Sequence, residues 1–170
     1  KKLVWVAVHF LDNVIDANIY PFKEVEDATK CNRKIGLGVM GFSDMLYAVG
    51  VKYDSEDGLK SAESVMKFIY EQAKEASIEL AKKRNVFPNW KKSIYADKGI
   101  KLRNAALLSI APTGSISMIA DCSSSIEPNF ALSYVKKVLG AEEFLYVNKH
   151  FATVAREKNF YSEELMKQIA

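Results

Sequence analysis

Residues 103–128 read RNAALLSIAPTGSISMIADCSSSIEP, and the interpretation of the whole chain starts from this stretch. Its first part, residues 105–110, is a short apolar run whose length and composition suit a buried strand. The run breaks at a turn over residues 111–115, and residues 116–120 have the composition of one or two helical turns. We therefore predict a strand, a turn and a short helix in succession.

A strand that delivers such a turn to a helix N-terminus creates a binding site for an anion. The first backbone N–H groups of a helix have no acceptor within it, and the helix dipole is positive at that end. Hydroxyl groups of Thr113, Ser115 and Ser117 add donors, and Gly114 lets a ligand approach the backbone closely. Phosphate is the anion that this chemistry suits best. The alternative is that these residues only form a turn and cap a helix, as Ser, Thr and Gly do in many proteins.

The composition is typical of one globular domain. The chain has 170 residues, of which 49% are hydrophobic and 26% charged, and its net charge is +3. So mild a charge argues against nucleic acid or a membrane surface as a partner, and no apolar run is long enough to cross a bilayer. Its two cysteines do not indicate a disulfide framework, so we expect a reducing, cytoplasmic setting. Helical patterns reach both ends of the sequence without a cap or a terminating residue, so we expect a piece of a longer protein.

The periodicity of apolar residues indicates a mostly helical α/β chain. It predicts helices over residues 3–17, 22–29, 42–49, 55–84 and 162–170. Besides residues 105–110, residues 129–138 alternate as a strand does, and residues 145–151 are a third strand candidate. Residues 89–101 are typical of a loop. We therefore predict two or three strands, with no internal repeat and no linker that would divide the chain.

Two patterns resemble functional motifs but lack the context that these motifs need. Gly36 and the five residues after it form a literal GxGxxG, but the residues before it are charged and no second strand follows. We therefore expect no dinucleotide site there. His9, Asp12 and Asp16 share a helix face at a spacing that metal ligands use. A solvated or hydrogen-bonded face is the commoner cause of that pattern, so no metal site is predicted.

Four separated segments match a known protein family in the family's order. They are RNA-x-x-x-x-IAPTGSIS with CSSSIEP, FLDNVIDANIYP at 10–21, RKIGLGVMGFSDML at 33–46 and ELAKKRNVFP at 79–88. This pattern resembles the large, catalytic subunit of ribonucleotide reductases, and in particular the adenosylcobalamin-dependent class II enzymes. The resemblance implies that residues 1–170 form the C-terminal portion of the catalytic domain, a ten-stranded α/β barrel in this family.

The resemblance also implies a function for the central turn. Enzymes of this family reduce ribonucleoside di- or triphosphates to deoxyribonucleotides by radical chemistry, and the substrate phosphates bind at this strand–turn–helix. The substrate-binding residues implied in this chain are Pro112, Thr113, Gly114, Ser115 and Ile116, with Ser117 as a weaker member.

No catalytic residue is expected within the chain. The radical cysteine, the redox cysteines and the catalytic Glu of the family belong to other motifs, including an Asn-x-Cys-x-Glu string that does not occur here. Cys31 and Cys122 have no CxxC partner and, like Glu127, inherit no catalytic role. The resemblance implies adenosylcobalamin as a cofactor, although no motif here binds a corrin. It also implies a ribonucleotide substrate, the rest of the same chain, a thioredoxin-like reductant and a homodimer as partners.

Two other functions are compatible with these residues. A non-catalytic nucleotide-phosphate-binding module would bind nucleotides without turnover, and an inactive structural fragment would bind none. Because the catalytic cysteines are missing, we expect the isolated 170-residue chain to have no reductase activity.

Overall fold

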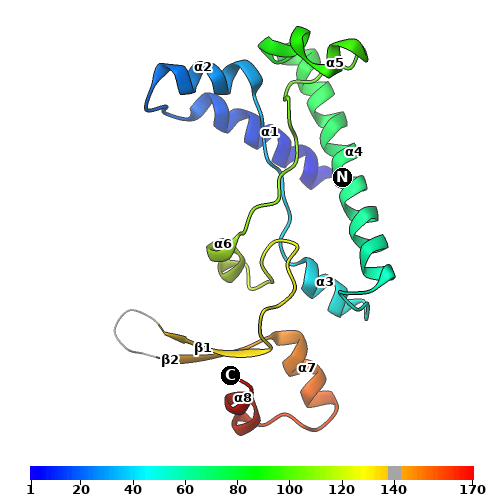
Figure 1. Cartoon of the computed structure of the whole chain (residues 1–170), viewed down its shortest axis with the longest axis vertical. Helices are drawn as coiled ribbons and strands as arrows, with labels where there is room; N and C mark the ends of the chain where they lie inside the picture. Colours follow the sequence, from blue (N-terminus) through cyan, green and yellow to red (C-terminus); the bar gives the residue numbers. More distant parts are fainter. Residues whose placement is uncertain (138–142) are drawn as a thin grey trace. The chain divides into compact units, whose positions relative to one another are not determined.

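The computed structural model describes residues 1–137 and 143–170, which fall into two compact units. Unit 1 comprises Lys1–Val39 and Leu59–Ala111, and unit 2 comprises Met40–Gly58 and Pro112–Ala170. The elements in chain order (Figure 1) are α1 (Lys2–Ala17), α2 (Lys23–Asn32), α3 (Phe42–Ala48), α4 (Glu56–Arg84), the 3-10 helix η1 (Pro88–Lys92), α5 (Ile94–Asp97), α6 (Gly114–Ile119), β1 (Ser133–Lys137), β2 (Glu143–Val147), α7 (Lys149–Glu157) and α8 (Glu163–Ile169). Within the described ranges, no helix has the length and apolar character needed to span a membrane.

The core of unit 1 forms where the apolar stripes of α1 and α4 are buried. The predicted helices over residues 3–17 and 55–84 are confirmed to within one residue at each end. Apolar side chains three or four positions apart share one helix face, which is why the stripes pack together. The buried cluster consists of Val8, Ile15, Ile35, Ala73, Ala76, Leu80 and Leu107.

A buried carboxylate on α1, Asp12, organises the polar part of unit 1. Its side chain is fully buried, and its Oδ1 accepts hydrogen bonds from Arg33 Nε at 2.9 Å and from Asn104 Nδ2 at 3.0 Å. Arg103 Nε lies 3.3 Å from the second oxygen. Arg33 also donates two hydrogen bonds of 2.8 Å to Asp16, one turn further along α1. The two aspartates that the sequence pattern placed on one helix face are therefore held by arginine side chains.

The predicted strand over residues 105–110 is wrong as a regular element. The segment forms a single parallel bridge, Leu37 with Leu108. Leu37 N donates to Leu107 O at 2.9 Å, and Ser109 N donates to Leu37 O at 3.1 Å. A strand needs a longer ladder of such bonds. Here the paired segment is short, because its partner soon leaves to begin α3.

The glycines of the GxGxxG pattern have packing and turn roles. A Cβ on Gly36 would lie 2.8 Å from Ser109 Cβ, and a Cβ on Gly38 would lie 2.7 Å from Ser109 O. Only glycine allows the two extended segments to approach this closely. Gly41 has a φ of +78° and precedes the first residue of α3. Close backbone packing and a helix start thus account for the pattern.

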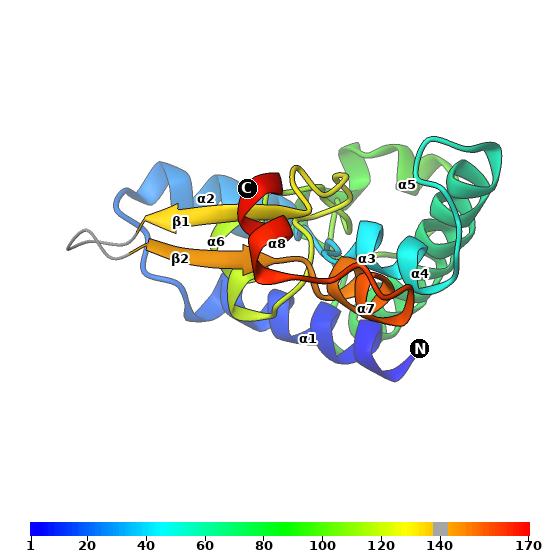
Figure 2. The same ribbon diagram turned by 90° about the horizontal axis from the view of Figure 1, so that it is seen from below.

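In unit 2, β1 and β2 form an antiparallel hairpin in which Val135 is opposite Leu145. Figure 2 shows α8 beside this hairpin, and the Ser133 hydroxyl donates to Met166 O at 2.8 Å. The predicted strand over residues 129–138 begins only at Ser133, and Val138 lies outside the described residues.

Two predictions for loops and strands are wrong because local hydrogen bonds favour helices. Residues 145–151 leave the extended conformation after Val147, since the Asn148 side chain accepts from Phe151 N at 3.1 Å and caps α7. Residues 89–101, predicted as a loop, contain η1 and α5. There, Ser93 Oγ donates to Trp90 O at 2.6 Å.

We predict that Asp12→Ala lowers the free energy of unfolding of unit 1 by about 3 kcal/mol, because Arg33, Arg103 and Asn104 lose the buried oxygens that accept their hydrogen bonds, although Arg33 keeps Asp16 as a partner. Denaturant unfolding followed by the fluorescence of Trp5 and Trp90, which both lie in unit 1, measures this. Asp16→Ala is the matched control, since Asp16 is half exposed and its loss is expected to have a smaller effect. Equal losses in the two variants would contradict the prediction.

The ion pair between Asp16 and Arg33 predicts a dependence of stability on pH. The hydrogen bonds from Arg33 lower the pKa of Asp16 below its ordinary value of 3.8. The pair therefore stabilises unit 1 above that value, and this contribution is lost as the pH falls through the lowered pKa. We expect the stability difference between wild type and Asp16→Asn to shrink as the pH falls from about 5 to about 2. A difference that stays constant over this range would refute the expectation.

Candidate functional site: an anion-binding turn

The predicted anion-binding turn lies in unit 2, directly before α6. Thr113 is the N-cap of α6, and its φ of +52° places it in the left-handed region, which is unfavourable for a β-branched residue. Helical bonding begins with Ser117 N, which donates to Thr113 O at 2.9 Å. The N–H groups of Gly114, Ser115 and Ile116 therefore have no acceptor within the helix. They are the donors that the sequence analysis expected.

The structure gives the predicted site residues unequal positions. Pro112, Gly114, Ser115 and Ile116 are exposed to solvent. Thr113 is half-buried, and Ser117 is buried. Pro112 has no N–H group, so it offers shape but no donor. The Ser117 hydroxyl is used inside the protein, 3.3 Å from Gly114 O and 3.0 Å from Ser124 Oγ. The donors open to a ligand therefore come from residues 113–116.

A run of three serines after α6 contacts the turn and α3. Ser125 N donates to Thr113 Oγ1 at 2.8 Å, and Ser124 Oγ pairs with Ser117 as described. Ser123 N donates to Asp44 Oδ2 at 2.6 Å. Ser125 has a φ of +48°, and its buried Oγ has no hydrogen-bond partner among the described residues.

Asp44 was not among the predicted site residues. This residue lies within α3, is 8% exposed, and contacts the serine run rather than solvent. A carboxylate between the apolar residues of the stretch FSDML was the available signal. Such a residue is buried only when it finds hydrogen-bond donors, and its donors lie far away in the sequence.

A cavity of about 350 Å³ borders the turn. Its wall includes Gly114 of α6 and Asp44 of α3. Phe130, Tyr134 and Tyr146 form a row of rings along it, with centroids 4.9 Å and 5.0 Å apart. The turn therefore borders a hollow with polar and aromatic walls.

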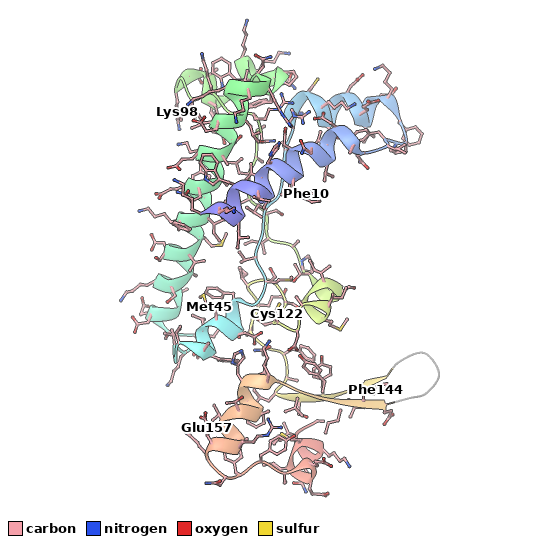
Figure 3. The ribbon with its side chains drawn as sticks, turned by 180° about the vertical axis from the view of Figure 1, so that it is seen from behind. Phe10, Met45, Lys98, Cys122, Phe144 and Glu157 are labelled. Atoms are coloured by element: carbon pink, nitrogen blue, oxygen red, sulfur yellow. The ribbon has the colours of Figure 1, made fainter. Side chains whose placement is uncertain are left out.

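The groups after the C-terminal end of α6 have shifted pKa values. Hydrogen bonds from the Tyr146 hydroxyl, at 2.7 Å, and from Lys149 lower the pKa of Asp121, and the same contact raises the pKa of Tyr146. Burial, and then the charge of Asp44, raises the pKa of the Cys122 thiol. Cys122, labelled in Figure 3, is therefore held in its protonated form, which is a poor nucleophile.

The turn is suited to binding rather than to chemical catalysis. Residues 112–117 contain no side chain that titrates near neutral pH. In the part of the chain that the structure describes, no group of three or more His, Cys, Asp or Glu side chains is placed to hold a metal ion. What the arrangement offers is a set of N–H and O–H donors for an anion.

Comparison with known proteins supports a family assignment. A family model described as "Ribonucleotide reductase, barrel domain" matches residues 1–102 and 97–170. Two relatives named "Vitamin B12-dependent ribonucleoside-diphosphate reductase" match along the entire chain. The protein from Thermoplasma acidophilum is 51% identical and the one from Mycobacterium tuberculosis 44%. The chain spans 22% and 24% of their respective lengths.

A solved structure agrees with this assignment. The class Id ribonucleotide reductase alpha subunit of Actinobacillus ureae matches with a TM-score of 0.81 at 29% sequence identity, over 98% of this chain and 30% of that chain. The described residues, mostly helical with one two-stranded sheet, correspond to a portion of such a subunit. The family expected from the four sequence segments is thus confirmed, and the chain belongs to the ribonucleotide reductase barrel-domain family.

Proposed function

We propose that this chain is part of an enzyme that reduces ribonucleoside di- or triphosphates to deoxyribonucleotides by radical chemistry, and that its central turn binds the substrate phosphates. The observation that carries the proposal is the exposed turn at residues 113–116, where backbone N–H groups and hydroxyls gather before α6. The names of the relatives that match the whole chain support the reaction class.

Each residue of the turn has a specific role in this proposal. The N–H groups of Gly114, Ser115 and Ile116 donate to phosphate oxygens, and the Ser115 hydroxyl adds a donor. The oxygen of Thr113 accepts a hydrogen bond from Ser125, which leaves its own O–H proton for the ligand. Pro112 shapes the approach, and Ser117 supports the turn from inside. When the phosphates are bound in a fixed position, the ribose is held in one place relative to the reacting groups. Binding by the turn would therefore promote the reaction by positioning the substrate.

The reacting groups belong to other parts of the enzyme in this proposal. The chain has no Asn-x-Cys-x-Glu string, and Cys122 is held protonated. We propose that residues 1–170 contribute to the wall of a ten-stranded barrel whose other strands carry the radical and redox cysteines. The isolated chain would then bind at most phosphate and would have no reductase activity.

The names of the relatives support a proposal for the cofactor of the whole enzyme. Because the two full-chain matches are named as vitamin B12-dependent, we propose adenosylcobalamin as the cofactor. The turn itself does not fit a corrin: its donors suit an anion, and neither histidine of the chain, His9 or His150, lies in it. We further propose a thioredoxin-like reductant and a homodimeric assembly. The two free cysteines support a cytoplasmic setting.

Replacement of Gly114 by Ala tests the phosphate-binding role. A Cβ at this position would have no atom within 4 Å, so Gly114→Ala is expected to leave the stability unchanged. The methyl group would occupy the space that a phosphate needs next to the backbone. We expect the KM for a ribonucleoside diphosphate to rise about tenfold in the full-length enzyme. Steady-state kinetics measures this change.

The control is Ile119→Ala, at the opposite end of α6, where the side chain is 86% exposed. It should leave KM unchanged. An unchanged KM for Gly114→Ala would rule out phosphate binding at this turn. Nucleotide binding without turnover by the full-length wild type would favour the binding module, and absence of both would favour the structural fragment.

A further inference from the structure

We infer that Asp44 is the positioning residue of the phosphate-binding turn, acting through the serine run Ser123–Ser125. This inference rests on the proposed function of the turn. Asp44 holds the serine run against α3, and the serine run in turn holds Thr113 and Ser117 in the conformation that presents the donors of residues 113–116.

The first step is a reciprocal pair of hydrogen bonds between Asp44 and Ser123. Asp44 Oδ2 accepts from Ser123 N at 2.6 Å, and Asp44 N donates to Ser123 Oγ at 3.3 Å. Both residues are buried, at 8% and 7% exposure. A short hydrogen bond to a carboxylate in a buried place is stronger than one between neutral groups. Ser123 is therefore fixed relative to α3.

The second step connects the serine run to the turn. Ser124 Oγ lies 3.0 Å from Ser117 Oγ, and Ser125 N donates to Thr113 Oγ1 at 2.8 Å. Ser124 and Ser125 thus bond to the turn, and Ser123 bonds to α3. Backbone bonds from Gly41 N to Ser123 O at 2.7 Å and from Phe42 N to Ser125 O at 3.4 Å add to the link with the start of α3. Cys122 N adds a bond of 3.0 Å to Ser117 O.

The turn needs this support because Thr113 and its partner Ser125 have strained backbones. Thr113 and Ser125 are both in the left-handed region, with φ values of +52° and +48°. Such residues are strained, and they keep this conformation only where neighbouring contacts impose it. Their mutual hydrogen bond joins the two strained positions, and the bonds between Asp44 and Ser123 anchor one side of the pair.

Two further hydrogen-bond donors restrict the rotation of the Asp44 side chain. Its Oδ1 lies 3.3 Å from Asn129 Nδ2 and 3.4 Å from Asn148 Nδ2. Asn148 is in turn fixed as the cap of α7. A carboxylate repels a phosphate group, so Asp44 affects the ligand through the serine run and not by contact.

The test compares affinities with and without phosphate in the full-length enzyme that contains this sequence. The probes are cytidine diphosphate and cytidine, and the readout is the ratio of their dissociation constants. In Asp44→Ala we expect the preference for the diphosphate to fall about tenfold, while the affinity for cytidine stays the same. Asp44→Asn keeps an oxygen that accepts from Ser123 N, so it should restore part of the preference.

Ser43→Ala is the matched control. Ser43 is the neighbour of Asp44 on α3 and is fully buried, but its hydroxyl accepts from Asn129 and is not bonded to the serine run. Ser43→Ala should retain the wild-type preference for the diphosphate. If Asp44→Ala does not fold, Ser124→Ala removes one link and should reduce the preference by a smaller factor.

The outcomes separate the inference from the proposed function. Asp44→Ala with a lower Tm but a wild-type preference for the diphosphate would overturn the inference and leave the proposed function intact. An equal loss of preference in Ser43→Ala would also overturn it, since any damage to α3 would then suffice. A wild-type enzyme without preference for the diphosphate would instead refute the proposed function.

Discussion

The hydrogen bonds between Asp44 and Ser123 link α3 to the segment that follows α6 in unit 2. Backbone bonds from Gly41 N to Ser123 O and from Phe42 N to Ser125 O reinforce this link, and we propose that together they set the register of the serine run against the turn. The exposed donors of residues 113–116 depend on that register, because neither Thr113 nor Ser125 would choose a left-handed backbone alone. In the proposed function, a binding surface made largely of backbone groups is thus supported by side chains that do not touch the ligand.

Unit 1 follows the same principle with a different chemistry. Asp12 is fully buried and is held by arginine and asparagine side chains, whereas Asp44 is held by neutral donors. Burial of a carboxylate is unfavourable unless its oxygens find donors, and once they do, the partners are difficult to rearrange. Among the described residues, each unit therefore has a buried aspartate, Asp12 or Asp44, to which distant segments bond.

Much of the helical structure could be predicted, because it depends on local periodicity. The stripes of α1 and α4 lie within single segments, and their bounds were correct to one residue. The predicted strand at residues 105–110 was wrong, and the helix α7 was missed. Residues 105–110 form only a short pairing because their partner, residues 35–38, is short. The helix α7 begins where the Asn148 side chain caps it. In the site, the turn was predicted, but its support was not.

The sequence by itself determined the family, the long amphipathic helices and the turn with its Thr, Gly and Ser donors, because all of these depend on neighbouring residues. The tertiary structure alone decided which carboxylates are buried and what holds them. Asp44 and Ser123 are 79 positions apart, and Asp12 and Asn104 are 92 apart. The sequence around each aspartate does not show which distant residues will bond to it. Only folding brings their donors within hydrogen-bonding distance, and burial then makes those bonds strong.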